Sequence, residues 1–102
     1  MVVEIYNVVA SFPEFEKYAL GSQLRRAAVS VPSNITEGTG RNNPKEFNQF
    51  IGIALGSCYE IETQLEIAFR LDYLEKERNE IINDRIDKIK NMSYKLQRTI
   101  TH

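Results

Sequence analysis

The sequence predicts an all-α protein folded as an antiparallel, up-down four-helix bundle. Apolar residues recur at steps of three and four along most of the chain, and only a few short segments interrupt this pattern. Short links between long helices favour neighbours that run in opposite directions. We find no segment with the alternation of a β-strand, no internal repeat and no linker, so residues 1–102 are expected to form one domain.

The first predicted helix covers residues 2–12. Its apolar face consists of Val2, Ile5, Val9 and Phe12. Phe12 precedes Pro13, and the residue before a proline disfavours helical geometry. Residues 13–18 are therefore expected to form a turn with some helical character.

The second predicted helix covers residues 19–37 and has a proline in its interior. Its apolar stripe consists of Leu20, Leu24, Ala27, Ala28, Val31 and Ile35. Pro32 removes one backbone hydrogen bond at a cost of roughly 3 kcal/mol in a normal helix interior, so tertiary packing must offset this cost. Gly38 and Gly40 supply the permissive backbone that helix ends use.

Asn43 and Pro44 mark the start of the third helix. Asn43 suits the N-cap position, and Pro44 suits the first helical position. The heptad seam of this helix consists of Phe47, Ile51, Ala54, Cys58, Ile61, Leu65 and Ala68. The fourth predicted helix covers residues 75–100. Its buried side consists of Ile82, Ile86, Ile89, Leu96 and Ile100.

Composition narrows the possible functions. The chain has 102 residues, with 13 Lys and Arg against 14 Asp and Glu. The net charge of -1 argues against broad electrostatic attachment to nucleic acid. Cys58 is the single cysteine, which fits a reducing cytoplasm. We expect no signal peptide and no membrane span, since no apolar run approaches the roughly 20 residues that a span needs.

One face of the second helix is polar but built mostly from small residues. It consists of Arg26, Ser30, Ser33, Asn34 and Glu37. Exposed faces usually carry long charged side chains, so we favour a packed polar network at a helix or subunit contact over a solvated face. A small-molecule site is the least favoured alternative. Glu62 is a candidate member of the network, through Arg25 or Arg26.

The third helix has apolar residues outside its seam, and they predict self-association. Gly52 and Gly56 lie away from the seam, although glycine in a helix costs about 1 kcal/mol relative to alanine. Ile53, Ile67 and Leu71 are also off the seam. We expect these five residues to form a second packing surface for copies of the same chain. The alternative is that they cover the edge of the same core.

No catalytic, metal-binding or cofactor-binding group is recognisable. Glu60, Glu62 and Glu66 lack the histidine partners of a di-iron bundle, because His102 is the only histidine. Cys58 has no histidine to activate it and lies on the apolar seam, so a buried hydrophobic role is expected. We therefore expect a protein that is not an enzyme and has no small-molecule substrate.

Basic residues gather in the second half of the last helix, and they have two possible explanations. Positive charge near a helix C-terminus is stabilising, which is the simpler explanation. A local basic patch that contacts RNA or DNA phosphates is the alternative. Its candidate residues are Arg25, Arg26, Arg41, Lys88, Lys95 and Arg98.

Two runs of sequence carry a resemblance to a known family: FPEFEKYALGSQLRRAAVSVPSNITEGTGR and KEFNQFIGIALGSCYEIETQLEIA. They resemble the bacterial 23S rRNA intervening-sequence proteins, which are four-helix bundles. The resemblance implies assembly into a ring, commonly a pentamer. A related group acts with diversity-generating retroelements through a strongly basic surface, and the mildly acidic charge of this chain departs from that group.

These observations favour a non-enzymatic, self-assembling bundle with a structural or adaptor role. The alternative is a nucleic-acid-associated accessory protein that acts through a basic patch of the assembled ring.

Overall fold

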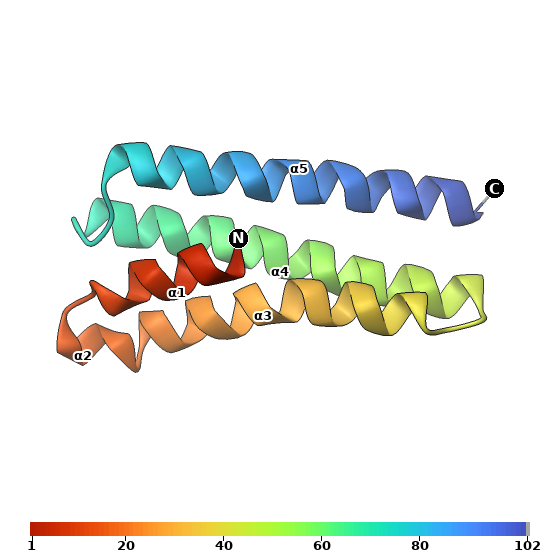
Figure 1. Cartoon of the computed structure of the whole chain (residues 1–102), viewed down its shortest axis with the longest axis horizontal. Coiled ribbons are helices and arrows are strands. Elements are labelled where there is room, and N and C mark those ends of the chain that lie inside the picture. Colours follow the sequence, from red (N-terminus) through yellow and green to blue (C-terminus); the bar gives the residue numbers. More distant parts are fainter. Residues whose placement is uncertain (102) are drawn as a thin grey trace.

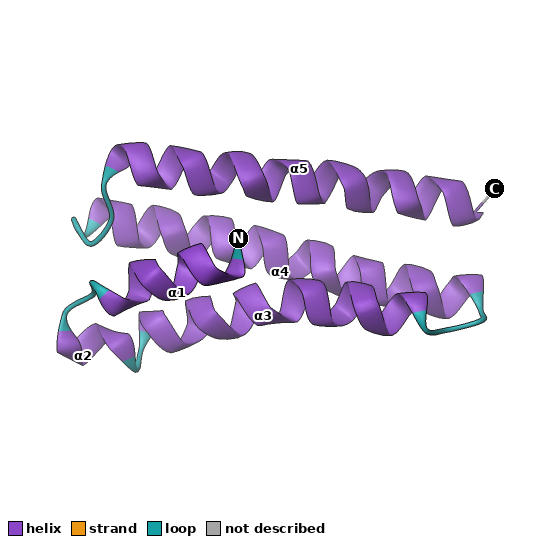
Figure 2. Cartoon of the chain, viewed as in Figure 1, coloured by secondary structure: helices purple, strands orange, loops and turns teal. Residues whose placement is uncertain are grey.

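The protein is all-helical in the part that its computed structural model describes, which is residues 1–101 with side chains through Thr99 (Figure 2). These residues form no strand. The elements are α1 (Val2–Ala10), α2 (Glu14–Lys17), α3 (Leu20–Thr39), α4 (Pro44–Arg70) and α5 (Lys76–Thr101). The expected turn after the first helix contains α2, a helix of four residues.

The three long helices lie side by side along a molecule of 45 × 23 × 17 Å, and the chain reverses direction at the loops after α3 and after α4 (Figure 1). The central helix α4 contacts both α3 and α5, whereas α1 packs against α3. The short α1 covers only part of the bundle length, at the end where α3 begins (Figure 1). None of the described helices is long and apolar enough to cross a lipid bilayer.

The predicted seam of α4 is confirmed, because all seven of its residues are buried. Leu24, Ala27, Ala28 and Val31 of α3 are buried as well, as are Ile82 and Ile86 of α5. Most of these side chains form one cluster with Ile5, Val8, Val9 and Phe12. The side chain of Ile100, predicted to be buried, lies outside the described residues.

A smaller apolar cluster lies toward the end of the bundle that α1 does not reach. It consists of Phe47, Ile51 and Leu55, with Ile35 and Leu96 packed against it. Asn43 caps the N-terminus of α4 as predicted, since its side chain accepts hydrogen bonds from Lys45 N (2.8 Å) and Glu46 N (3.3 Å).

Two predicted helix ends differ from the structure. The first helix ends at Ala10 instead of residue 12, and Ser11 caps it. The second extends to Thr39, because Gly38 is part of the helix and packs closely against α4. A Cβ atom on Gly38 would lie 3.1 Å from Phe50 Cβ. The role of Gly38 is therefore close packing inside the helix. The predicted helix-ending role is wrong for Gly38, whereas Gly40 does lie at the C-cap of α3.

The helix α3 continues through Pro32, as predicted. Pro32 is itself exposed, while its neighbour Val31 is only 2% exposed. Burial of the apolar stripe of α3 supplies the packing that offsets the lost hydrogen bond.

Candidate functional site

A small polar contact joins α3 and α4 at the middle of the bundle. The Ser57 hydroxyl on α4 donates to Ser30 Oγ on α3 at 2.9 Å. The Asn34 amide donates to Ser30 Oγ at 2.9 Å and to the Ser30 carbonyl oxygen at 2.7 Å. Because Ser57 is 7% exposed, this contact is largely shielded from water. Two of the predicted network residues, Ser30 and Asn34, therefore meet at a helix–helix contact.

The other predicted members of this network do not join it. Arg26 and Ser33 are exposed on α3. Glu37 is exposed too, and its Oε1 pairs with Arg41 Nη2 at 2.6 Å. Helical spacing placed these residues on one face, but only the edge of that face nearest α4 is covered. The prediction of a single five-residue network on α3 is therefore wrong for this chain by itself.

Glu62 pairs with α5 and not with Arg25 or Arg26. Its Oε1 lies 2.5 Å from Lys90 Nζ, which also lies 3.2 Å from Asp87 Oδ1. The hydrogen bond to Glu62, followed by that to Asp87, raises the pKa of Lys90 even though burial lowers it. Arg25 instead donates to the Lys17 carbonyl oxygen at 3.1 Å.

The aromatic side chain of Tyr59 adds to this α4–α5 contact. Lys90 Nζ lies 4.6 Å from the centre of the Tyr59 ring, a cation–π distance. The Tyr59 and Tyr94 hydroxyls lie 2.8 Å apart in a hydrogen bond. Sequence reasoning missed Ser57, Lys90 and Tyr94 as contact residues, because their partners lie on another helix.

The residues predicted for self-association lie exposed on α4, with Leu71 at its C-cap. The exposed fractions are 51% for Ile53, 44% for Ile67 and 49% for Leu71. Gly52 and Gly56 are exposed as well, and a Cβ atom on Gly56 would have no neighbour within 4 Å. We call these five residues the outer α4 face. In the single chain about half of each large apolar side chain on this face stays exposed, so the fold leaves much of their apolar surface uncovered.

The predicted nucleic-acid residues come from two helices and a loop, and some are already engaged. Arg41 pairs with Glu37, and its guanidinium carbon lies 5.2 Å from the centre of the Phe50 ring. Arg25 is half-buried. Arg26, Lys88, Lys95 and Arg98 are exposed.

Cys58 is fully buried, as its place on the seam predicts. Burial is the main cause that raises the pKa of its thiol to about 11, and the Glu62 carboxylate adds to the effect. A thiol with so high a pKa is a poor nucleophile at neutral pH. Within residues 1–101, no three His, Cys, Asp or Glu side chains come together as a metal site.

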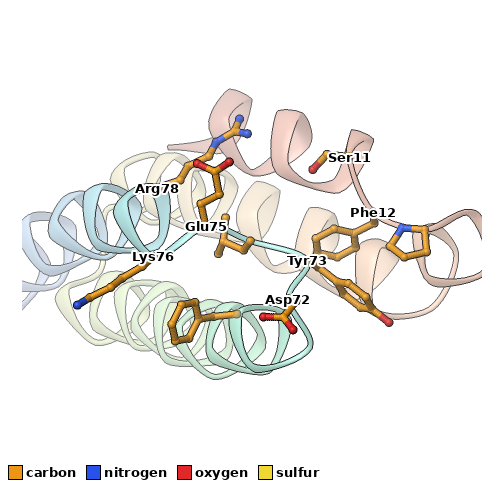
Figure 3. A pocket seen from close by; sticks show the side chains of 10 residues that line it. Ser11, Phe12, Asp72, Tyr73, Glu75, Lys76 and Arg78 are labelled. Carbon is orange, nitrogen blue, oxygen red and sulfur yellow. The ribbon is translucent and has the colours of Figure 1, made fainter.

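A hollow of about 700 Å³ lies at one end of the bundle, where the loop after α1 meets the loop between α4 and α5 (Figure 3). Phe12 and Tyr73 face each other there, with ring centres 5.4 Å apart. The Tyr73 hydroxyl donates to Glu16 Oε2 at 3.1 Å, and desolvation together with this bond raises the pKa of Tyr73. The charged residues on the rim are exposed, so we assign no chemistry to this hollow.

The geometry defines a helical bundle with a polar contact between α3 and α4 and an exposed apolar face on α4. The chain belongs to the 23S rRNA-intervening sequence protein family, whose model matches residues 1–95. It is similar to a crystal structure of a protein of unknown function from the S23 ribosomal protein family of Bacteroides thetaiotaomicron. The two share 25% identity with a TM-score of 0.83, over 94% of this chain and 87% of the other. No protein with a curated description is significantly similar in sequence.

Proposed function

We propose that the protein is a non-enzymatic helical bundle that self-associates and acts through its assembly, as a structural or adaptor protein of the cytoplasm. The observation behind this proposal is the outer α4 face. Three large apolar side chains there are about half exposed. An exposed apolar patch of this kind is typical of a protein–protein contact.

The two glycines of the outer α4 face support the same proposal. Each costs the helix about 1 kcal/mol relative to alanine. The fold requires neither glycine, since Gly56 faces open space and a Cβ atom on Gly52 would lie 3.9 Å from its nearest neighbour, Gln97 Nε2. Small residues allow another helix to approach closely. The ring that the family resemblance implies, commonly a pentamer, is the assembly that we propose.

Sedimentation velocity at micromolar concentration tests this proposal. We expect the wild-type protein to sediment as a multiple of its 11.8 kDa chain mass. Ile67→Asp places a charge on the outer α4 face and should reduce the species to the monomer. Gln23→Asp adds the same charge at an exposed position of α3 and should leave the assembly intact. A wild-type protein that is monomeric throughout would contradict the proposal.

A second candidate function is binding of nucleic acid, and one observation favours it. Lys88 and Lys95 are exposed and take part in no ion pair within the described residues. Binding to a single-stranded RNA across a salt series tests this function, because phosphate contacts weaken steeply with salt. Affinity that falls with salt and with Lys95→Gln would support it, and no binding at low salt would exclude it.

A further inference from the structure

A second exposed face lies on α5. Ile81 and Met92 are 45% and 48% exposed, and Lys88 and Lys95 are exposed beside them. These four residues follow one another at helical steps of seven, four and three, so they share one side of the helix. We call them the α5 stripe. Nothing in the described chain covers it.

The outer α4 face and the α5 stripe have complementary charge. Glu60 lies between Gly56 and Ile67 on the exposed side of α4, and it has no ion pair within residues 1–101. Its neighbours Glu62 and Glu66 are both engaged, the first by Lys90 and the second by Arg70. The α5 stripe offers two lysines that form no ion pair with any described residue. Opposite charges across a contact guide encounter and fix its register.

The outer α4 face and the α5 stripe also lie at matching positions along the bundle axis. The Tyr59–Tyr94 and Glu62–Lys90 contacts set the level at which α4 and α5 lie beside each other. The two helices run in opposite directions (Figure 1). Because both rise equally per residue, the two contacts place Glu60 level with the segment between Lys88 and Lys95. By the same count, Leu71 is level with Ile81.

We propose that the outer α4 face of one copy packs against the α5 stripe of the next copy. Rotation about an axis parallel to the helices keeps every residue at its own height, so Glu60 meets the two lysines and Leu71 meets Ile81. The two sides of this contact differ, and such a contact builds rings or open chains instead of two-fold dimers. The inference rests on the proposed self-association and names its two surfaces.

Two variants, each with a charge placed on one of the two faces, test this pairing by sedimentation velocity. Ile67→Asp blocks the outer α4 face, and Met92→Asp blocks the α5 stripe. Both positions are exposed, and circular dichroism with thermal melting checks that each variant is folded. We expect each variant alone to be monomeric. An equal mixture should give dimers with one copy of each variant, because each variant retains the face that the other has lost.

The outcomes separate this pairing from self-association itself. A monomeric wild-type protein would overturn both. If the wild-type protein and the Met92→Asp variant are equally oligomeric, only the pairing is overturned. The outer α4 face would then contact itself or another face of the next copy. A mixture that yields no dimer would overturn the pairing as well.

Charge reversal provides an independent test. Glu60→Lys should raise the dissociation constant by about fivefold, as expected for an exposed ion pair. Lys88→Glu with Lys95→Glu should weaken assembly similarly, and all three substitutions together should restore it. Glu46→Lys, which reverses a charge elsewhere on α4, serves as the control. If the triple variant assembles no better than the double variant, the assigned pairing is wrong.

Discussion

Ser30 and Ser57 meet hydroxyl to hydroxyl across the α3–α4 contact, at 2.9 Å. Ser57 is the more buried of the two, while Ser30 also accepts a hydrogen bond from the Asn34 amide. The contact is directional and therefore favours one register of α3 against α4, unlike the non-directional apolar contacts of the core.

Replacement of Ser57 tests how much this contact contributes to stability. Ser57→Ala removes the donor, and we expect the free energy of unfolding to fall by about 1 kcal/mol. Ser33→Ala is the matched control, since Ser33 lies exposed on α3 and the same gain in helix propensity applies. Urea denaturation of both variants measures the difference. Equal stabilities would show that the serine pair contributes nothing.

The apolar seams could be predicted from sequence, but the polar contacts could not. A buried stripe such as that around Ile51 and Ile61 repeats along one helix, so its period is visible in one chain segment. The partner of Ser57 or Glu62 depends on how two helices are aligned, which no local pattern specifies. The helical wheel therefore grouped Arg26 and Ser33 with Ser30, although α4 covers only Ser30.

The glycines show the same limit of prediction from sequence, because a local pattern does not reveal what packs against each of them. Gly21 is required by close packing, since a Cβ atom there would lie 2.7 Å from Val9 Cγ1 and 3.2 Å from the Glu16 carbonyl oxygen. Gly56 faces open space. Both read alike in the sequence, as small residues inside a helix.

Alanine substitution should separate these two glycines. We expect Gly21→Ala to destabilise the fold by about 1 to 3 kcal/mol, because Val9 is buried and cannot move aside freely. Gly56→Ala should stabilise the isolated chain by up to about 1 kcal/mol through helix propensity. Thermal melting at a concentration where the chain is monomeric measures both. A stabilising Gly21→Ala would mean that α1 is docked on α3 less tightly than the short distances around Gly21 indicate.

Asp72 has the left-handed backbone conformation that favours glycine, with a φ angle of 63°. It follows the end of α4, where Tyr73 N donates to the Ala68 carbonyl oxygen at 2.9 Å and Asp72 N donates to that of Phe69 at 3.0 Å. Hydrogen bonds of this kind close a helix and favour glycine at the left-handed position.

Glycine at this position should therefore stabilise the fold. We expect Asp72→Gly to raise the free energy of unfolding by about 0.5 to 1 kcal/mol, since it relieves the unfavourable φ angle. Asp84→Gly, in the interior of α5, should lower it by a similar amount. Urea denaturation compares the two, and a loss of stability in both would indicate that the Asp72 side chain has an unrecognised role.

The buried thiol of Cys58 predicts how stability changes at alkaline pH. Its pKa is raised from the ordinary value of 9.0 to about 11, mainly by burial. Between these values the unfolded chain loses the thiol proton while the folded chain keeps it, so ionisation favours the unfolded state. The free energy of unfolding should therefore fall as the pH rises from about 9 to about 11, by about 1 to 2 kcal/mol after allowance for solvent screening.

Comparison with Cys58→Ala isolates this effect, because every other titratable group is present in both proteins. Below about pH 9 the wild-type protein should be more stable than the variant by a constant amount, which reflects lost packing. Above that pH the difference should shrink as the unfolded thiol ionises. If the two profiles stay parallel up to about pH 11, the Cys58 thiol ionises equally in both states. The seam around it would then admit water, which is incompatible with the dry interior that the buried residues of α3, α4 and α5 define.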